Sequence, residues 1–261
     1  MRAATLALSV FVALSACAAA PLRGTAPAAT AAAFRDDPRP RLWYVGLGMY
    51  DESWSENDVA DLAAALERGA PGFRVIPTIF ANETRSARRR FPAVEPRQVA
   101  ATIADIATVA GPADVVLVYV STHGAPGLLG RSAAGEALEP VDPAAMQSWL
   151  APLRDHDTVL ILSACFSGSF IPALQGPHRI IFAAARADRT SFGCQAGAKH
   201  TIFGDALLRA LRPPRESLRT VVAATRGTVT TRERALHVDQ PSLPQLSVGA
   251  AARRLYDSPV F

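Results

Sequence analysis

The amino-acid sequence predicts an α/β domain with a mostly parallel central β-sheet. Two short runs, Val115–Val120 and Val159–Leu162, are almost wholly apolar and rich in β-branched residues. Runs of this kind are typical of strands that are buried on both faces of a parallel sheet. The segment between them, Pro143–Leu153, carries apolar residues at helical spacing. A strand, a crossover helix and a second strand bring both strand ends to the same edge of the sheet.

Upstream of these runs the pattern alternates between strands and helices. Arg41–Tyr50 predicts the first strand, and the amphipathic helix that follows it ends at Gly69. Phe73–Phe80 predicts the second strand. Pro77 places this strand at an edge or a bulge, because proline donates no hydrogen bond to a ladder. A second amphipathic helix begins at Pro96, since proline suits the first turn of a helix.

Downstream of the two runs the elements are shorter. Ser167–Leu174 predicts a turn into a short helix, and Arg179–Ala184 predicts the next strand. Thr201–Leu211 predicts a helix that two prolines stop. The pattern of Ser217–Thr230 fits a helix and a strand equally, so both remain open. Gln240–Gly249 is expected to form a final loop and strand.

The N-terminal segment predicts export and anchoring. Residues 1–16 combine a positive charge, an apolar run and small residues, as secretory signals do. Their last residues, followed by Cys17, resemble a bacterial lipobox and predict lipidation of Cys17, with an ordinary cleaved signal peptide as the alternative. Residues 17–40 are rich in Ala, Pro and Thr and predict a flexible tether, which leaves 41–261 as one domain.

The predicted location is the bacterial cell envelope. The residue after Cys17 is an alanine, where an aspartate is associated with retention in the inner membrane. We therefore expect anchoring in the outer membrane, facing the periplasm of a double-membraned bacterium. No later apolar run has the length of a membrane span, so the domain is expected to lie beside the bilayer.

Charge and histidine spacing indicate no nucleic acid, metal or cofactor. The net charge is +4, and Arg85–Arg90 holds four arginines without interleaved aromatic residues. We interpret this cluster as a solvated stretch, with an anionic-surface patch as the alternative. The histidines lack carboxylate or cysteine partners at metal-ligand spacing, so no metal site is predicted.

Each of the two central runs ends in a reactive side chain that glycine soon follows. His123 and Gly124 come after the first run, and Cys165 and Gly168 come after the second. A free thiol has a pKa of about 8.5, and a neighbouring imidazole increases its thiolate fraction. Cys165 is therefore predicted to attack a carbonyl carbon while His123 protonates the leaving group. The backbone amides of Gly124 and Cys165 are predicted to stabilise the oxyanion.

The motifs Thr-His-Gly and Ala-Cys-Phe-Ser-Gly, each after a buried strand, resemble those of caspase-fold cysteine peptidases, and most nearly the legumain-like peptidases of family C13. The 42-residue spacing from His123 to Cys165 agrees with a histidine some 50 residues upstream in caspase-type enzymes. The resemblance extends over roughly 41–248. It implies a three-layer α/β/α fold and a cysteine-type endopeptidase that acts on proteins or peptides.

The resemblance weakens at the substrate pocket. Legumains place a glutamate two residues before the nucleophile, where this sequence has Ser163. The pocket is therefore not expected to select asparagine. Asp188 and Arg189 are candidates for a different polar pocket together with Ser163, and a surface ion pair is the alternative for both charged residues.

Other functions stay open at this point. Resolution of a thioacyl intermediate by an amine would make the enzyme a transpeptidase. A caspase-fold module that binds a protein without catalysis is a second alternative. A redox-regulated thiol protein is a third, and it requires a disulfide between Cys165 and Cys194. No third residue that orients His123 is evident, because Asp114 and Asp157 precede their strands and are expected at the opposite edge.

Overall fold

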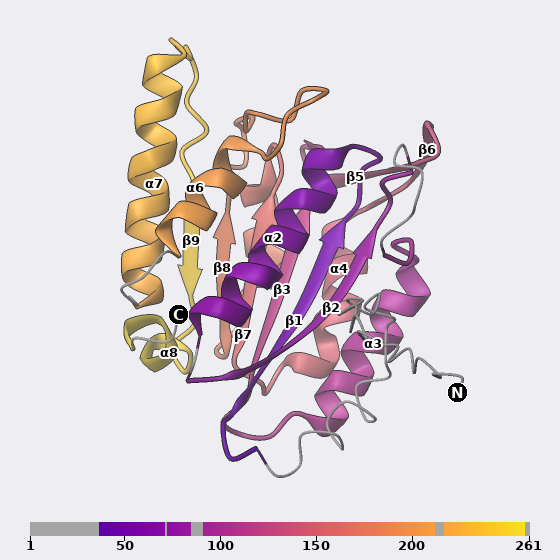
Figure 1. Cartoon of the computed structure of the whole chain (residues 1–261), viewed down its shortest axis with the longest axis vertical. Coiled ribbons are helices and arrows are strands. Elements are labelled where there is room, and N and C mark those ends of the chain that lie inside the picture. Colours follow the sequence, from indigo (N-terminus) through magenta and orange to yellow (C-terminus); the bar gives the residue numbers. More distant parts are fainter. Residues whose placement is uncertain (1–36, 71, 85–90, 212–216, 259–261) are drawn as a thin grey trace, which may run out of the picture.

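The structure is a computed structural model that describes residues 37–70, 72–84, 91–211 and 217–258 (Figure 1). The predicted signal peptide, Cys17 and the arginine cluster 85–90 lie outside the described residues. Within these ranges, no helix has both the length and the apolar character needed to cross a bilayer.

The central sheet has six strands in the order β2-β1-β3-β7-β8-β9. All neighbours are parallel except β9, which runs antiparallel to β8. The strands are β1 (Arg41–Gly48), β2 (Arg74–Ala81), β3 (Val115–Ser121), β7 (Thr158–Ser163), β8 (Arg179–Ala183) and β9 (Gln245–Val248). The edge position of β2 confirms the prediction made from Pro77.

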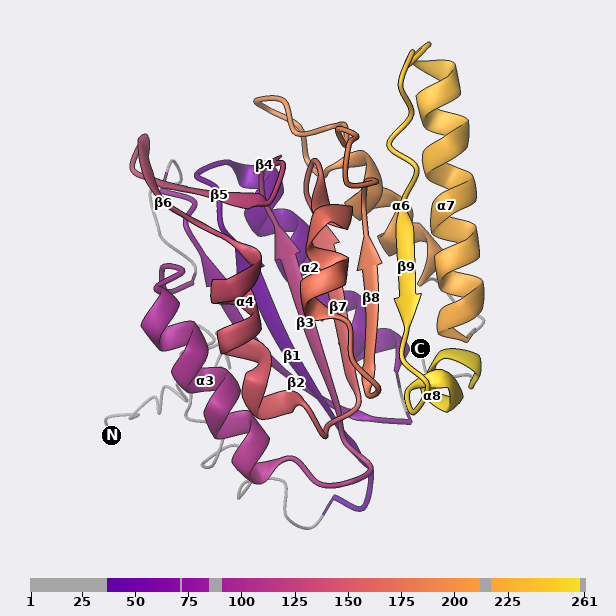
Figure 2. The ribbon, with the colours of Figure 1, turned by 180° about the vertical axis from the view of Figure 1, so that it is seen from behind.

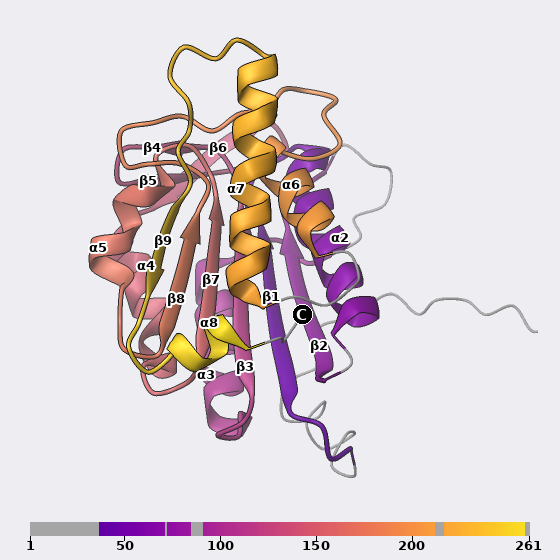
Figure 3. The ribbon, with the colours of Figure 1, turned by 90° about the vertical axis from the view of Figure 1, so that its left-hand side faces the viewer.

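Helices cover both faces of this sheet, so the three-layer α/β/α prediction is confirmed. One face carries α2, α6, α7 and α8, and the other carries α3, α4 and α5 (Figures 2 and 3). The helices are α2 (Ser53–Gly69), α3 (Pro96–Val109), α4 (Pro143–Leu150), α5 (Ile171–Leu174), α6 (Ile202–Ala210), α7 (Leu218–Ala235) and α8 (Arg253–Asp257), with 3₁₀ turns at Ala151–Leu153 and Ser167–Phe170.

The continuous apolar character of β3 and β7 follows from this layering. Leu117 and Tyr119 of β3 pack into the core under α2 and α6, whereas Val116 and Val118 pack into the core under α3 and α4. Successive side chains of a strand point to opposite faces, so both sets of positions must be apolar. Every residue of β3 and β7 is buried.

Four elements differ from or complete the sequence predictions. A small antiparallel sheet, β4 (Gly124–Ala125), β5 (Leu128–Ala133) and β6 (Glu136–Val141), follows β3 and was not predicted. Its strands are short and mix apolar with polar residues, and their turns depend on Gly127 and Gly135 at positive φ. The undecided segment Ser217–Thr230 is helical, because α7 begins after an N-cap whose hydroxyl accepts a hydrogen bond from Thr220 N at 3.3 Å.

Candidate active site

The carboxyl ends of β3 and β7 bring the two predicted reactive residues to one sheet edge. The strands are adjacent and parallel, with Ser121 opposite Ser163 in the register. His123 and Cys165 each follow two residues later. Open α/β folds hold ligands at this edge.

The backbones of the histidine and cysteine segments touch directly at Gly124. A Cβ atom at this position would overlap the carbonyl oxygen of Cys165 and come within 3.2 Å of the Ala164 side chain. Only glycine fits without displacing the cysteine segment. At Gly124, and likewise at Gly168, the atoms that leave no room for a side chain belong to the backbone of the protein itself.

The Cys165 sulfur is bracketed by the backbone of Ser191. The Ser191 N–H donates to Sγ at 3.2 Å, and the thiol donates to the Ser191 carbonyl oxygen at 3.4 Å. Ser191 lies in the loop after β8, 26 residues further along the chain. Sequence reasoning missed this residue, since nothing in the local pattern reveals where a loop returns.

The turn after Cys165 is held in a tight conformation. Phe166 has a φ of 55°, in the left-handed region, where a bulky side chain is strained. Its N–H donates to the Arg189 carbonyl oxygen at 2.8 Å. A Cβ atom at Gly168 would lie 2.8 Å from the carbonyl oxygen of Ala185 and 2.9 Å from the amide nitrogen of Ala187. The loop after β8 therefore clamps the cysteine turn.

The His123 ring is oriented by aromatic packing. The ring centroids of Tyr50 and Trp54 lie 4.3 and 5.1 Å away, both in edge-to-face arrangements. Among the described residues, no side chain forms a hydrogen bond with the imidazole. Burial lowers the pKa of His123, and the charge of nearby Glu52 opposes this effect. Burial therefore favours the neutral form of the ring. Sequence reasoning missed both aromatic residues.

A cavity of about 560 Å³ opens beside His123, between the loop after β1 and the small antiparallel sheet. Its walls are mixed, with apolar side chains such as Leu128 and Leu138 and the polar groups of Tyr50 and Glu52. Cys165 does not line this cavity. This cavity, which is large enough for several side chains, is therefore bordered by the histidine and not by the cysteine.

The predicted pocket residues lie in two different environments. Ser163 is 1% exposed and its hydroxyl lies 3.1 Å from that of Thr201, so it faces the core and not an open pocket. Asp188 is on the surface, where ion pairs with Arg186 and Arg189 lower its pKa. These charged residues therefore match the surface ion-pair alternative, although the loop that carries them contacts the cysteine turn.

The other residues considered in the sequence analysis are Asp114 and the two cysteines. Asp114 accepts hydrogen bonds from Arg41 N and Trp43 Nε1 at the opposite edge, as expected from its position before β3. Both Cys165 and Cys194 are free thiols, and burial together with the proximity of Cys165 raises the pKa of Cys194. Across the described ranges, no group of three or more His, Cys, Asp and Glu side chains could hold a metal ion.

Comparisons with known proteins agree with this arrangement. The structure is similar to the crystal structure of caspase-1 from Spodoptera frugiperda, with a TM-score of 0.55 and 17% identity over 80% of this chain and 86% of that one. At this identity the likeness shows the caspase-like fold. No curated protein matches the sequence. The model of the peptidase C13 family matches residues 97–245, more than half of the chain. The chain therefore belongs to the peptidase C13 family.

Proposed function

We propose that this protein is a cysteine endopeptidase that cleaves peptide bonds through Cys165 and His123. The contact between Gly124 and the Cys165 backbone carries the proposal, because it holds the histidine and cysteine segments side by side at one sheet edge. Membership of the C13 family supports peptidase chemistry and a protein or peptide substrate.

The proposed reaction has two halves. The Cys165 thiolate attacks the scissile carbonyl carbon, and the N–H groups of Gly124 and Cys165 stabilise the resulting oxyanion. His123, which has taken the thiol proton, gives it to the leaving amine as the C–N bond breaks. A thioester remains on Cys165. His123 then removes a proton from water, which attacks the thioester, and the released thiol regains that proton.

For the N-terminal part we propose lipidation of Cys17 and an outer-membrane location facing the periplasm. The lipobox-like residues before Cys17 and the Ala, Pro and Thr composition of 17–40 support this proposal. Mass spectrometry of the N-terminal peptide from membrane fractions tests it. A peptide that begins at Cys17 and carries acyl chains is the expected result, and an unmodified one would contradict it.

The catalytic proposal is tested with the full-length protein in detergent, under reducing conditions, on a library of peptides from a digested proteome. Mass spectrometry of new termini should find cleavage by the wild type and by Cys194→Ala, a matched control for loss of a half-buried thiol. Cys165→Ala should produce none. Equal cleavage by Cys165→Ala would refute the mechanism. Products joined to an added amine would indicate transpeptidation, and no products with any variant would favour a binding module.

A further inference from the structure

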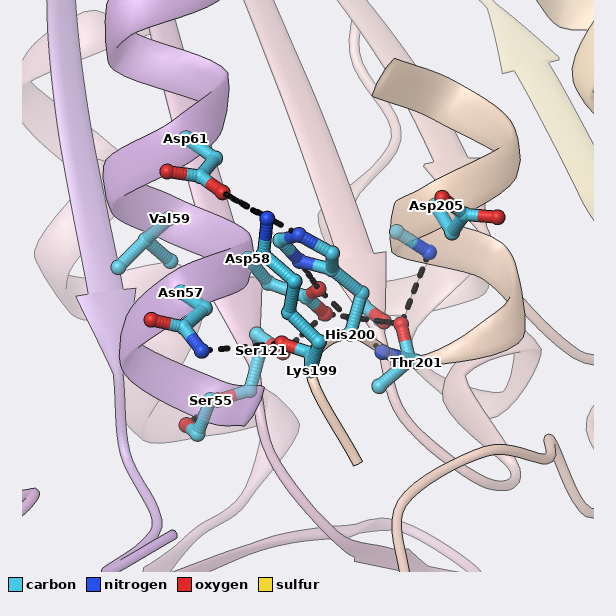
Figure 4. A network of polar contacts seen from close by, with 12 residues as sticks. Ser55, Asn57, Asp58, Val59, Asp61, Ser121, Lys199, His200, Thr201 and Asp205 are labelled. Atoms are coloured by element: carbon cyan, nitrogen blue, oxygen red, sulfur yellow. Dashed lines mark hydrogen bonds and ion pairs between the residues drawn. The ribbon is translucent and has the colours of Figure 1, made fainter. Parts of the chain in front are cut away.

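A buried carboxylate lies beneath the sheet edge that carries His123 and Cys165. Asp58 belongs to α2, is 0% exposed, and faces Ser121, His200 and Thr201 (Figure 4). A charged group in such a position is stable only when hydrogen bonds replace its lost hydration. Its partners therefore show which parts of the chain it holds together.

The carboxylate of Asp58 is hydrogen-bonded to two segments, the end of β3 and the residues just before α6. Oδ2 accepts from the hydroxyls of Ser121 and Thr201, both at 2.8 Å. Oδ1 accepts from the Thr201 amide at 3.3 Å and lies 3.1 Å from Nδ1 of His200. Burial raises the pKa of Asp58, and the hydrogen bonds from His200, Thr201 and Ser121 oppose this effect.

Thr201 extends the hydrogen-bond network of Asp58 to β7. Its hydroxyl has one proton, which goes to the carboxylate of Asp58. The Ser163 hydroxyl, 3.1 Å away, must therefore be the donor in its contact with Thr201. The same Thr201 oxygen accepts from Gly204 N at 2.8 Å and caps α6. Asp58 thus binds the last residue of β3 directly and the last residue of β7 through Thr201.

This connection has a consequence for the reacting groups. Ser121 and Ser163 stand opposite each other in the register, and each lies two residues before a reactive side chain. A shift of one strand end relative to the other would change the distance between the imidazole and the thiol. Misplacement of reacting groups by about 1 Å is enough to lower rates roughly 100-fold.

We infer that Asp58 is a positioning residue, which acts through Ser121, Thr201 and Ser163 to hold His123 and Cys165 in reacting geometry. The inference rests on the proposed function, because it assumes that these two residues react together. It adds a role for α2 and the start of α6, which contribute neither the nucleophile nor the base.

Two substitutions test the role of Asp58. Asp58→Asn keeps the shape and removes the charge. Thr201→Val removes the hydroxyl that joins Asp58 to β7, and Thr201→Ser restores it. Thr158→Val is the matched control, because Thr158 is a fully buried threonine at the other end of β7 whose hydroxyl donates to the His156 carbonyl oxygen at 2.9 Å.

The first measurement is the rate at which iodoacetamide alkylates Cys165, followed by mass spectrometry with Cys194 as the internal reference. In the wild type, Cys165 should react faster. We expect Thr201→Val to slow this reaction roughly tenfold or more, and Thr201→Ser and Thr158→Val to leave it within about twofold. On the library peptide cleaved fastest by the wild type, kcat should fall with KM unchanged.

The outcomes separate the two proposals. Equal alkylation of Cys165 and Cys194 in the wild type would overturn the proposed function and this inference together. A fast wild-type reaction that Thr201→Val leaves unchanged, with a melting temperature lowered as in Thr158→Val, would overturn the positioning role alone. If Asp58→Asn does not fold, the threonine variants still decide between these results.

Discussion

The two ends of β3 and β7 differ in how the titratable side chains next to the strands are held. At the amino ends, Asp114 accepts three hydrogen bonds and forms an ion pair with Arg41. Asp157 contacts the ring of His178. At the carboxyl ends, no described side chain forms a hydrogen bond with the His123 ring, which packs against Tyr50 and Trp54, and Phe166 next to Cys165 adopts a strained backbone conformation. One end of the sheet is arranged for stability, and the other keeps groups available for reaction.

The largest effect is expected from a substitution at the carboxyl ends of the two strands. His123→Gln should lower peptide cleavage by roughly 100- to 10,000-fold, because no other described residue near Cys165 replaces its proton transfer. The folded state should persist, since the ring forms no hydrogen bond with another described residue. Initial rates and circular dichroism check both parts. Retained cleavage would show that His123 is not the acid.

The second largest effect is a loss of stability, expected from a substitution at the amino ends of the strands. Asp114→Ala should destabilise the protein by about 3 kcal/mol, because it leaves the buried donor of Trp43 and the partly buried donors of Arg41 and Gly111 without an acceptor. Urea unfolding measures this loss. Asp157→Ala at the same edge is the control, since its partly exposed contact with His178 is worth at most about 1 kcal/mol. Equal losses would remove the contrast between the two aspartates.

A third change sharpens the comparison at the cysteine turn. Gly168→Ala should lower activity roughly tenfold, because the added methyl group must push away the backbone of Ala185 and Ala187 and shift Cys165. Gly176→Ala is matched to it, as no atom lies within 4 Å of its added Cβ. Rates for the two variants are compared on one peptide. Similar rates would show that the turn tolerates displacement.

The smallest effect concerns pH. Burial holds the folded-state pKa of His123 below its usual 6.5, so the unfolded chain binds a proton first as the pH falls. Stability from this residue is complete above about pH 6.5 and decreases below it. Melting temperatures should therefore fall less with acid in His123→Gln than in the wild type. Parallel curves for the two proteins would contradict a lowered pKa.

Much of the fold could be predicted from the sequence because strand burial and helix amphipathicity are local patterns. The apolar runs located β3 and β7, and their crossover placed His123 and Cys165 at one edge. The small sheet β4–β6 escaped prediction because its short strands of mixed polarity are shaped by glycine turns and neighbouring loops. No periodicity signals such a structure.

The environment of the site was less predictable because distant segments build it. Ser191 reaches Cys165 from the loop after β8, and Tyr50 and Trp54 reach His123 from the segment after β1. Ser163 was expected in a substrate pocket. Its hydroxyl instead joins the buried network, because Val159, Ile161 and Ser163 alternate onto the face covered by α6. The face of the sheet to which the Ser163 side chain points can be assigned only when the position of α6 is known.

The aromatic setting of His123 also affects which ring nitrogen carries the proton. A carboxylate partner would fix one tautomer of an imidazole. Tyr50 and Trp54 restrict the plane of the ring, yet neither bonds to one of its nitrogens. Both tautomers are therefore accessible as far as the described residues are concerned, and the same ring can serve the leaving amine first and the incoming water afterwards without breaking a hydrogen bond to any of them.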